Sequence, residues 1–191
     1  METNVDGSCI ITNMSEEMFN DALFYKEKVD NTDDFFLIRR YRRNAIILFC
    51  ASAEAWMNNT IKDNLEKKSS LTADEQEILD FIVDYNSKMP RGFSNVKNKL
   101  YNFIPRAIIG KSVDWNNEPQ DVFEEYIRLS NMRNNVIHYA SKNSDVFYNE
   151  NFITLIHQAP DIIESLFQKY ESMGSTLGVP SWYKKRESRI I

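Results

Sequence analysis

A long stretch without glycine or proline, residues 33–68, constrains the fold of this chain more than any other feature. No helix breaker interrupts it, and its composition suits one continuous α-helix. Between Ala45 and Met57, apolar residues recur on every side of the projected helix, which is typical of a helix that is buried all round. The sequence therefore predicts a helical bundle built around one central helix.

Shorter helical segments make up the rest of the chain. We expect them over about 15–28, from Thr72 to before Met89, from Ser94 or Asn95 to Pro105 or Gly110, from Pro119 into 131–139, and over about 151–173, where Pro160 should kink or split the helix. Five glycines and five prolines are too few for a many-stranded β fold. We predict a single all-α domain over residues 1–191, a bundle of about five main helices, with its core at about 33–173 and flexible tails at 1–14 and 174–191.

Charge and cysteine content exclude several classes of function. The net charge of −5 argues against a sequence-blind nucleic-acid coat, although it allows a local basic cleft. Cys9 and Cys50 offer no metal spacing and the carboxylates form no metal-binding pattern, so we expect neither a metal nor a cofactor. Residues 1–20 lack a cationic signal-peptide region, and no apolar run is long enough to span a bilayer. These features predict a cytoplasmic protein without membrane association.

Glu54 lies within the most apolar part of the predicted central helix. A buried carboxylate without a partner is expensive, and the residues one turn away, Cys50 and Asn58, cannot neutralise it. Its partner must therefore come from another helix, and Arg133 is a candidate.

The segment 131–139 places Arg133, Asn134 and His138 in a predicted helix. Histidine can move protons near neutral pH, arginine matches phosphate oxygens with its planar fork, and an amide can orient either group. Asn134 and His138 face the same way on a helix, so a hydrogen bond between them is geometrically reasonable. Arg133 and His138 lie about 140° apart on an ideal helix. Either the helix is distorted, or Arg133 works with His138 of a second subunit.

The residue types alone favour a simpler interpretation of this segment. An arginine and a histidine near the end of a helix often only stabilise its last carbonyl groups. This interpretation stays open beside the chemical one.

Arg133-Asn134 followed by His138, late in a helical chain, resembles the motif of the HEPN superfamily. The earlier segment from Arg42-Arg43 through Ser52 to Glu54-Ala55 is similar to the first core helix of HEPN-type nucleases, where an acidic residue lies near the motif. The resemblance implies a HEPN-like helical bundle and a homodimer in which two motifs meet in one cleft. It also implies metal-independent endoribonuclease activity that leaves 2′,3′-cyclic phosphate ends.

The same resemblance implies a role for each residue of the site. His138 would act in proton transfer, Arg133 would bind the scissile phosphate, and Asn134 would orient the site. Glu54 would hold Arg133 or His138 in place. Proteins of this kind commonly act on RNA as toxins or antiphage effectors, so an antitoxin or a defence-system partner is also implied.

Other residues are weaker candidates. The four cations of the first turns of the central helix could bind RNA phosphates, but a solvated face paired with acids explains them equally well: Arg39, Arg40, Arg42 and Arg43. Trp182, Tyr183 and the basic cluster 184–186 could hold single-stranded RNA, although a disordered tail is the simpler interpretation. His157 is expected to be a packing residue.

Two alternatives to a nuclease follow from these patterns. The first is a non-catalytic HEPN domain that binds RNA or nucleotide or serves as a dimerisation module. The second is a plain helical interaction protein in which Arg133 and His138 only end a helix.

Overall fold

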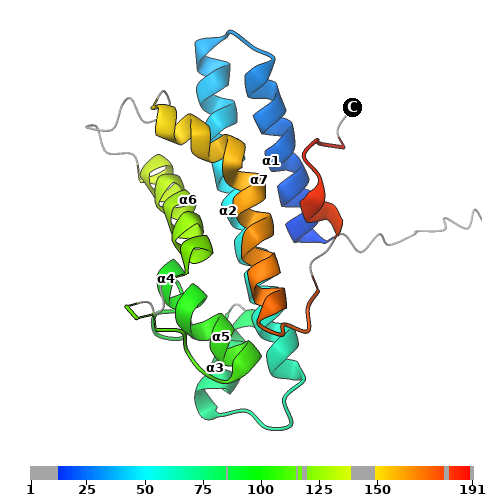
Figure 1. The fold of residues 1–191 in the computed structure, drawn as a ribbon, viewed down its shortest axis with the longest axis vertical. Helices are drawn as coiled ribbons and strands as arrows, with labels where there is room; N and C mark the ends of the chain where they lie inside the picture. The colour runs from blue at the N-terminus through cyan, green and yellow to red at the C-terminus, as the bar shows by residue number, and fades with distance from the viewer. Residues whose placement is uncertain are drawn as a thin grey trace, which may run out of the picture.

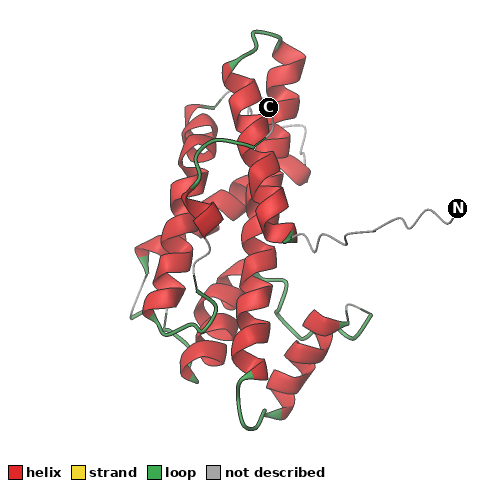
Figure 2. Ribbon diagram, turned by 90° about the vertical axis from the view of Figure 1, so that its right-hand side faces the viewer, coloured by secondary structure: helices red, strands yellow, loops and turns green. Residues whose placement is uncertain are grey.

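The computed structural model describes residues 13–84, 86–114, 116–117, 120–138, 149–178 and 181–189. These residues form helices joined by loops and contain no β-strand (Figures 1 and 2), which confirms the all-α prediction. Residues 1–12 of the tail expected at 1–14, the helix start at Pro119 and the end of the motif segment at Tyr139 lie outside the described residues.

Two helices joined by a short loop open the fold as a hairpin (Figure 1). They are α1, Met14–Asp30, and α2, Phe35–Glu66, and α2 confirms the predicted central helix. Asp34 caps α2, because its Oδ1 atom accepts the backbone N–H groups of Phe36 and Leu37, each at 2.9 Å. The hairpin buries the inner face of α1 against the first half of α2.

Shorter helices gather at the opposite end of the molecule. α3, Ala73–Val83, begins with the predicted capping box of Thr72 and Glu75. Residues 96–109 then form one helical run of three parts: α4 (Val96–Asn98), the π-helix η1 (Lys99–Phe103) and α5 (Ile104–Ile109). The run ends at Gly110, whose φ of 74° is a left-handed conformation that glycine adopts without strain.

The last two long helices, α6 (Asp121–Ile137) and α7 (Glu150–Ser172), pack against each other and against α2. Figure 1 shows α6 beside α7, with α7 curving in its first half. The sequence predicted either a kink or a split at Pro160, and the split does not occur, because α7 continues through that residue. Proline removes only one helical hydrogen bond, and the buried position of Pro160 lets core packing outweigh that loss.

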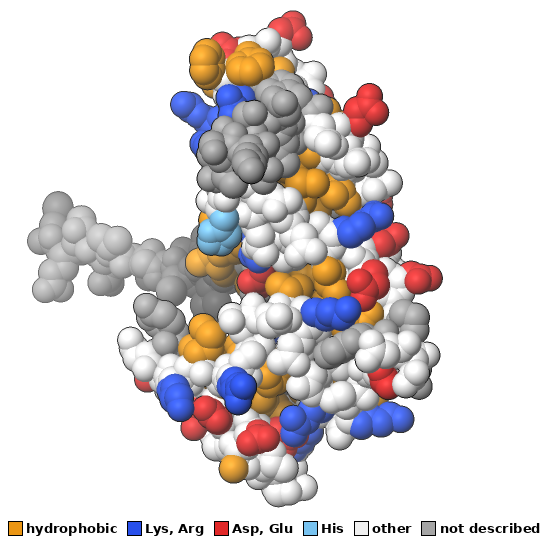
Figure 3. All heavy atoms as spheres, turned by 90° about the vertical axis from the view of Figure 1, so that its left-hand side faces the viewer, with side chains coloured by type: hydrophobic (Ala, Val, Ile, Leu, Met, Phe, Trp, Pro, Cys, Tyr) orange, Lys and Arg blue, Asp and Glu red, His pale blue; other side chains and the backbone are white. Residues whose placement is uncertain are grey.

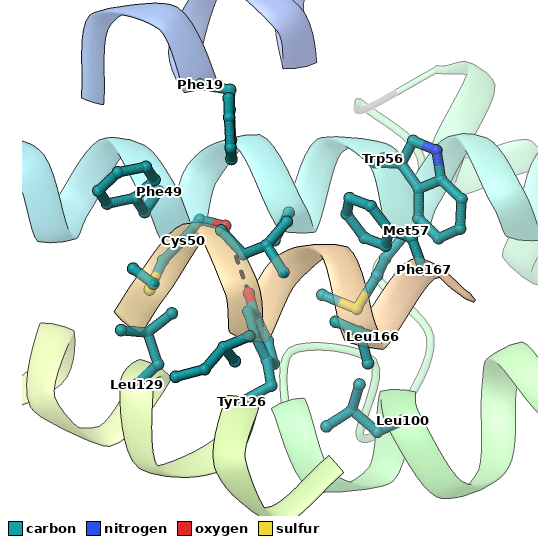
Figure 4. Close-up of a cluster of buried hydrophobic side chains, with 14 of the residues drawn as sticks. Phe19, Phe49, Cys50, Trp56, Met57, Leu100, Tyr126, Leu129, Leu166 and Phe167 are labelled. Atoms are coloured by element: carbon teal, nitrogen blue, oxygen red, sulfur yellow. Dashed lines mark hydrogen bonds between the residues drawn. The ribbon is translucent and has the colours of Figure 1, made fainter. Parts of the chain in front are cut away.

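The hydrophobic core lies between α2 and the helices around it (Figure 4). The Trp56 and Phe167 rings, from α2 and α7, have centroids 3.7 Å apart. The labelled side chains of the cluster come from α1, α2, η1, α6 and α7: Phe19, Phe49, Cys50, Trp56, Met57, Leu100, Tyr126, Leu129, Leu166 and Phe167. Every long helix therefore contributes to one core around α2.

The C-terminal segment differs from the expected loose tail in its described part, 181–189. The 3₁₀-helix η4, Ser181–Lys184, buries Trp182 and Tyr183 against α1 and α7. The centroid of the Tyr183 ring lies 5.5 Å from that of the Phe19 ring and 4.1 Å from that of the Phe167 ring. Arg186 beyond it pairs with Asp161 of α7 at 2.7 Å. Burial of two aromatic side chains outweighs the disorder signalled by the nearby glycine, proline and lysines.

Candidate functional site

Glu54 and Arg133 form an ion pair between α2 and α6. The Arg133 Nη1 atom donates to Glu54 Oε1 at 2.6 Å. The two side chains are 17% exposed for Arg133 and 30% for Glu54, so the pair lies at the edge of the core. This contact confirms the predicted partner of Glu54. It also explains how a carboxylate is accommodated in the apolar middle of α2.

Two further N–H groups of Arg133 bind neighbours on its own helix. Nη2 donates to Ser130 Oγ at 3.3 Å, and Nε donates to Asn134 Oδ1 at 3.2 Å. Burial lowers the pKa of Arg133, but the negative charge of Glu54 and its hydrogen bond more than offset that effect and hold the pKa above its ordinary value. Arg133 is therefore a fixed cation whose orientation is set from three sides.

His138 is the C-cap residue of α6. Its backbone N–H donates to the Asn134 carbonyl at 2.8 Å, and its side chain is exposed. α6 stays α-helical through Ile137, so helix distortion does not bring Arg133 and His138 together within one chain. Among the described residues, no hydrogen bond joins the side chains of Asn134 and His138, because the Asn134 oxygen faces Arg133 instead.

A groove of about 560 Å³ runs between α6 and α7 on the exposed side of α6. Its walls are rich in amides and hold one cation: Arg128, Asn131, Met132, Asn135, Asn151, Thr154, Leu155 and Gln158. His138 follows Asn135 by three residues, so helical spacing places it on the same face. Neutral amides offer both donors and acceptors, which suits the edges of bases or ribose hydroxyls. The sequence interpretation missed this groove, although the spacing of Asn131, Asn135 and His138 contains its signal.

Lys99 is a second feature that the sequence interpretation missed. It begins the π-helix η1 and is 7% exposed. Its Nζ atom donates to Asn58 Oδ1 at 3.0 Å and lies 4.4 Å from the centre of the Phe93 ring. Burial lowers the pKa of Lys99, the charge of Glu54 raises it and the charge of Arg133 lowers it, with a net shift downward. A lysine between Val96 and Phe103 on a predicted apolar face was the available signal.

Two neutral groups close the inner side of the ion pair. Burial raises the pKa of the Cys50 thiol to about 12, with Arg133 lowering it and Glu54 raising it. The Tyr126 hydroxyl donates to the Cys50 carbonyl at 3.4 Å, and burial raises its pKa well above the ordinary value (Figure 4). Neither group ionises near neutral pH, so the charges that act at this site are those of Glu54, Arg133 and Lys99.

The four arginines of α2 differ in exposure. Arg40 and Arg43 are exposed, whereas Arg39 and Arg42 are partly buried, and the Arg39 guanidinium lies 5.7 Å from the centre of the Phe35 ring. On the face drawn in Figure 3, basic and acidic side chains are interspersed. His157, expected to pack in the core, is exposed.

Among the described residues, no three His, Cys, Asp or Glu side chains lie close enough together to hold a metal ion. Within the same residues, no helix combines the length and the apolar character needed to cross a bilayer. Comparisons of the chain with protein-family models, with curated proteins and with solved structures found no match.

Proposed function

We propose that this protein is a metal-independent endoribonuclease of HEPN type, in which a 2′-hydroxyl group of the RNA attacks the adjacent phosphorus. The observation that supports the proposal most strongly is the Glu54–Arg133 pair. It places a fixed arginine on α6, one turn before the helix end that carries an exposed histidine. A cation held in place and a histidine that can transfer a proton are two of the groups that in-line phosphoryl transfer requires.

In the proposed reaction the 2′-oxygen attacks the adjacent phosphorus while the bond to the 5′-oxygen of the next nucleotide breaks. The products are a 2′,3′-cyclic phosphate and a 5′-hydroxyl group. His138 acts in the transfer of the proton that leaves the 2′-hydroxyl group and the proton that the departing 5′-oxygen gains. Arg133 stabilises the negative charge on the phosphate oxygens, and Asn134 and Glu54 orient its guanidinium. Every atom is supplied by RNA and protein side chains, so the reaction needs no metal.

The proposed site is completed by a second copy of the chain. Arg133 points towards α2, whereas His138 is on the exposed side of α6. A homodimer that completes the site would have to set the His138 end of one α6 against the exposed edge of the Glu54–Arg133 pair in the other subunit. The amide-lined groove between α6 and α7 would then lie beside the cleft and could contact the RNA.

A non-catalytic binding or dimerisation domain is the second candidate function. The observation that favours it is the occupancy of Arg133, whose Nε, Nη1 and Nη2 atoms all donate to protein acceptors. Three of its five N–H donors are therefore used within the chain, which suits a joint between α2 and α6. The net charge of −5 also favours weak or local contact with RNA.

A cleavage assay in excess EDTA separates the two functions. Wild type, Arg133→Ala and His138→Ala are incubated with tRNA, rRNA and single-stranded oligonucleotides. His157→Ala serves as the matched control, because it removes the other exposed histidine. Cleavage by wild type and His157→Ala alone, with cyclic-phosphate ends, supports the nuclease. Equal cleavage by all variants indicates a contaminant, and cleavage by none favours the binding domain.

The composite site has its own test. Arg133→Ala and His138→Ala are mixed, unfolded and refolded together so that mixed dimers form. A mixed dimer keeps one intact pairing of Arg133 from one subunit with His138 from the other, and partial recovery of cleavage is expected. A monomeric wild type, or mixed dimers without recovery, refutes the composite site.

The proposed biological role is that of a toxin or defence effector in the cytoplasm, held in check by an antitoxin or a defence-system partner. Expression of wild type in a bacterial host should arrest growth, and expression of His138→Ala should not. Growth arrest by both variants contradicts a role that depends on RNA cleavage.

A further inference from the structure

Lys99 is a buried cation without a carboxylate in direct contact. Among the described residues, no acidic oxygen lies within 4.0 Å of its Nζ atom, and the neutral Asn58 oxygen is its hydrogen-bond acceptor. An ammonium group has three donors, so one acceptor and the face of Phe93 satisfy it only in part. Burying such an incompletely paired group costs stability, so its presence here calls for an explanation.

The location of Lys99 ties it to the Glu54–Arg133 pair. Asn58 follows Glu54 by one turn of α2, so the hydrogen bond holds the ammonium one turn away from the carboxylate. The π-helix η1 begins at Lys99, and its wider turn changes which side chains face α2. The nearby Lys97 points elsewhere and pairs with Glu124 at 3.8 Å.

Arg133 contacts the Glu54 carboxylate and Lys99 is held one turn away from it, so the three charges leave one positive charge in excess. Without Lys99, Glu54 would neutralise Arg133 and leave a poor site for an anion. With Lys99 charged, the cluster can accept one more negative charge at little cost. A phosphodiester has that charge.

We propose that Lys99 is a positioning residue of this site, whose buried charge offsets Glu54 and so allows Arg133 to bind a singly charged phosphodiester. The proposal rests on the proposed function for the identity of the anion as an RNA phosphate. Lys99 acts through Glu54 and need not touch the phosphate. Its contribution to anion binding is electrostatic, so it depends on the net charge of the cluster and not on the shape of the lysine side chain.

Two substitutions remove the excess charge in different ways. Lys99→Met deletes the cation, and Asn58→Asp keeps it but places a carboxylate beside it. Lys99→Arg preserves the charge, and Lys111→Met removes one exposed lysine from the neighbouring loop as a control for net charge. If the excess charge of the cluster did not matter for anion binding, Asn58→Asp would behave like wild type.

The test is a titration with dimethyl phosphate, the simplest phosphodiester anion, at low ionic strength. Binding is followed by the Nε–H NMR signal of Arg133, which Arg133→Met identifies. We expect saturable binding by wild type, Lys99→Arg and Lys111→Met. We expect binding about tenfold weaker for both Lys99→Met and Asn58→Asp, the size of effect produced by one partly buried charge.

Each outcome decides the proposal. No response in wild type, or unchanged binding by Lys99→Met and Asn58→Asp, overturns it. Loss in Lys99→Met alone assigns Lys99 a structural role and also overturns it. If the phosphate binding of the variants follows the expected pattern but the protein cleaves no RNA, the proposed nuclease function is refuted and the role of Lys99 stands. If the protein cleaves RNA but Lys99→Met binds phosphate as wild type does, the role of Lys99 is refuted and the nuclease function stands.

Discussion

The Glu54–Arg133 pair should contribute measurably to stability, because it is shielded from water more than a surface ion pair. We consider Glu54→Gln, Arg133→Met and the double variant. Charge-assisted hydrogen bonds contribute about 1.5–3 kcal/mol, exposed ion pairs about 0.2–1 kcal/mol, and removal of one partner of a fully buried pair costs about 3–5 kcal/mol. With exposures of 17% and 30%, the pair falls between these limits. We expect a coupling energy of about 1–2 kcal/mol.

The assay is urea unfolding of the four proteins at neutral pH, followed by circular dichroism. Each single variant should lose stability, and the double variant should lose less than the sum of the two. In thermal unfolding, 1 kcal/mol corresponds to about 2–4 °C for a domain of this size. The exposed pair Lys62–Glu66, with nitrogen and oxygen 3.8 Å apart, is the matched control. Its coupling should stay below about 0.5 kcal/mol.

A coupling energy for Glu54 and Arg133 no larger than that of Lys62 and Glu66 would refute this reasoning. It would mean that water screens the pair as fully as on an open helix face. Arg133 would then be free to change partners without cost, and its fixed orientation could not support the proposed site.

Three further perturbations test other parts of the structure. Burial holds the pKa of Lys99 in the folded chain below its ordinary value of 10.5, so between those two values the folded chain binds fewer protons than the unfolded chain and stability rises with pH. Lys99→Met should therefore be more stable than wild type at neutral pH, and urea unfolding should show this advantage shrinking towards pH 10.5. A difference in stability that does not change with pH would contradict this prediction. In the same assay, Trp182→Ala should lower the free energy of unfolding by about 3–5 kcal/mol, and the control Lys184→Ala in the same turn by about 0–0.5 kcal/mol. Equal effects of the two substitutions would mean that η4 does not belong to the core. Gly92→Ala should cost about 1–2 kcal/mol, because φ is +78° and a Cβ atom would lie 2.8 Å from an asparagine nitrogen, whereas Gly178→Ala meets no atom and should change thermal stability little.

The parts of the fold that could be predicted from the sequence depend on local rules. The central helix needs only the absence of glycine and proline, and the capping box at Thr72 needs only two residues at a fixed spacing. The Glu54–Arg133 contact was also predictable, because a carboxylate in an apolar helix must find a cation and few arginines are placed to supply it. The angle of about 140° between Arg133 and His138 follows from helix geometry alone.

The features that were not predicted depend on contacts between distant segments. Trp182 and Tyr183 fill a surface made by α1 and α7, and nothing near them in the sequence signals that surface. Lys99 was assigned to no site because an α-helical projection gives no indication of the π-helix that begins there. Asn134 was expected to face His138, but the guanidinium of Arg133 competes for the same amide oxygen and is the stronger donor.

The composition of the cluster itself argues for a function beyond packing. Replacing a buried ion pair by apolar residues of similar volume often leaves a protein equally stable or more stable, so three charges at the edge of a core are a poor means of joining two helices. A structural joint between α2 and α6 would need only Glu54 and Arg133, and the pair is neutral by itself. Lys99 adds a buried charge that this joint does not need, held by Asn58 one turn from the carboxylate. An excess charge maintained against its own desolvation is most simply explained by an anion that the site is built to receive.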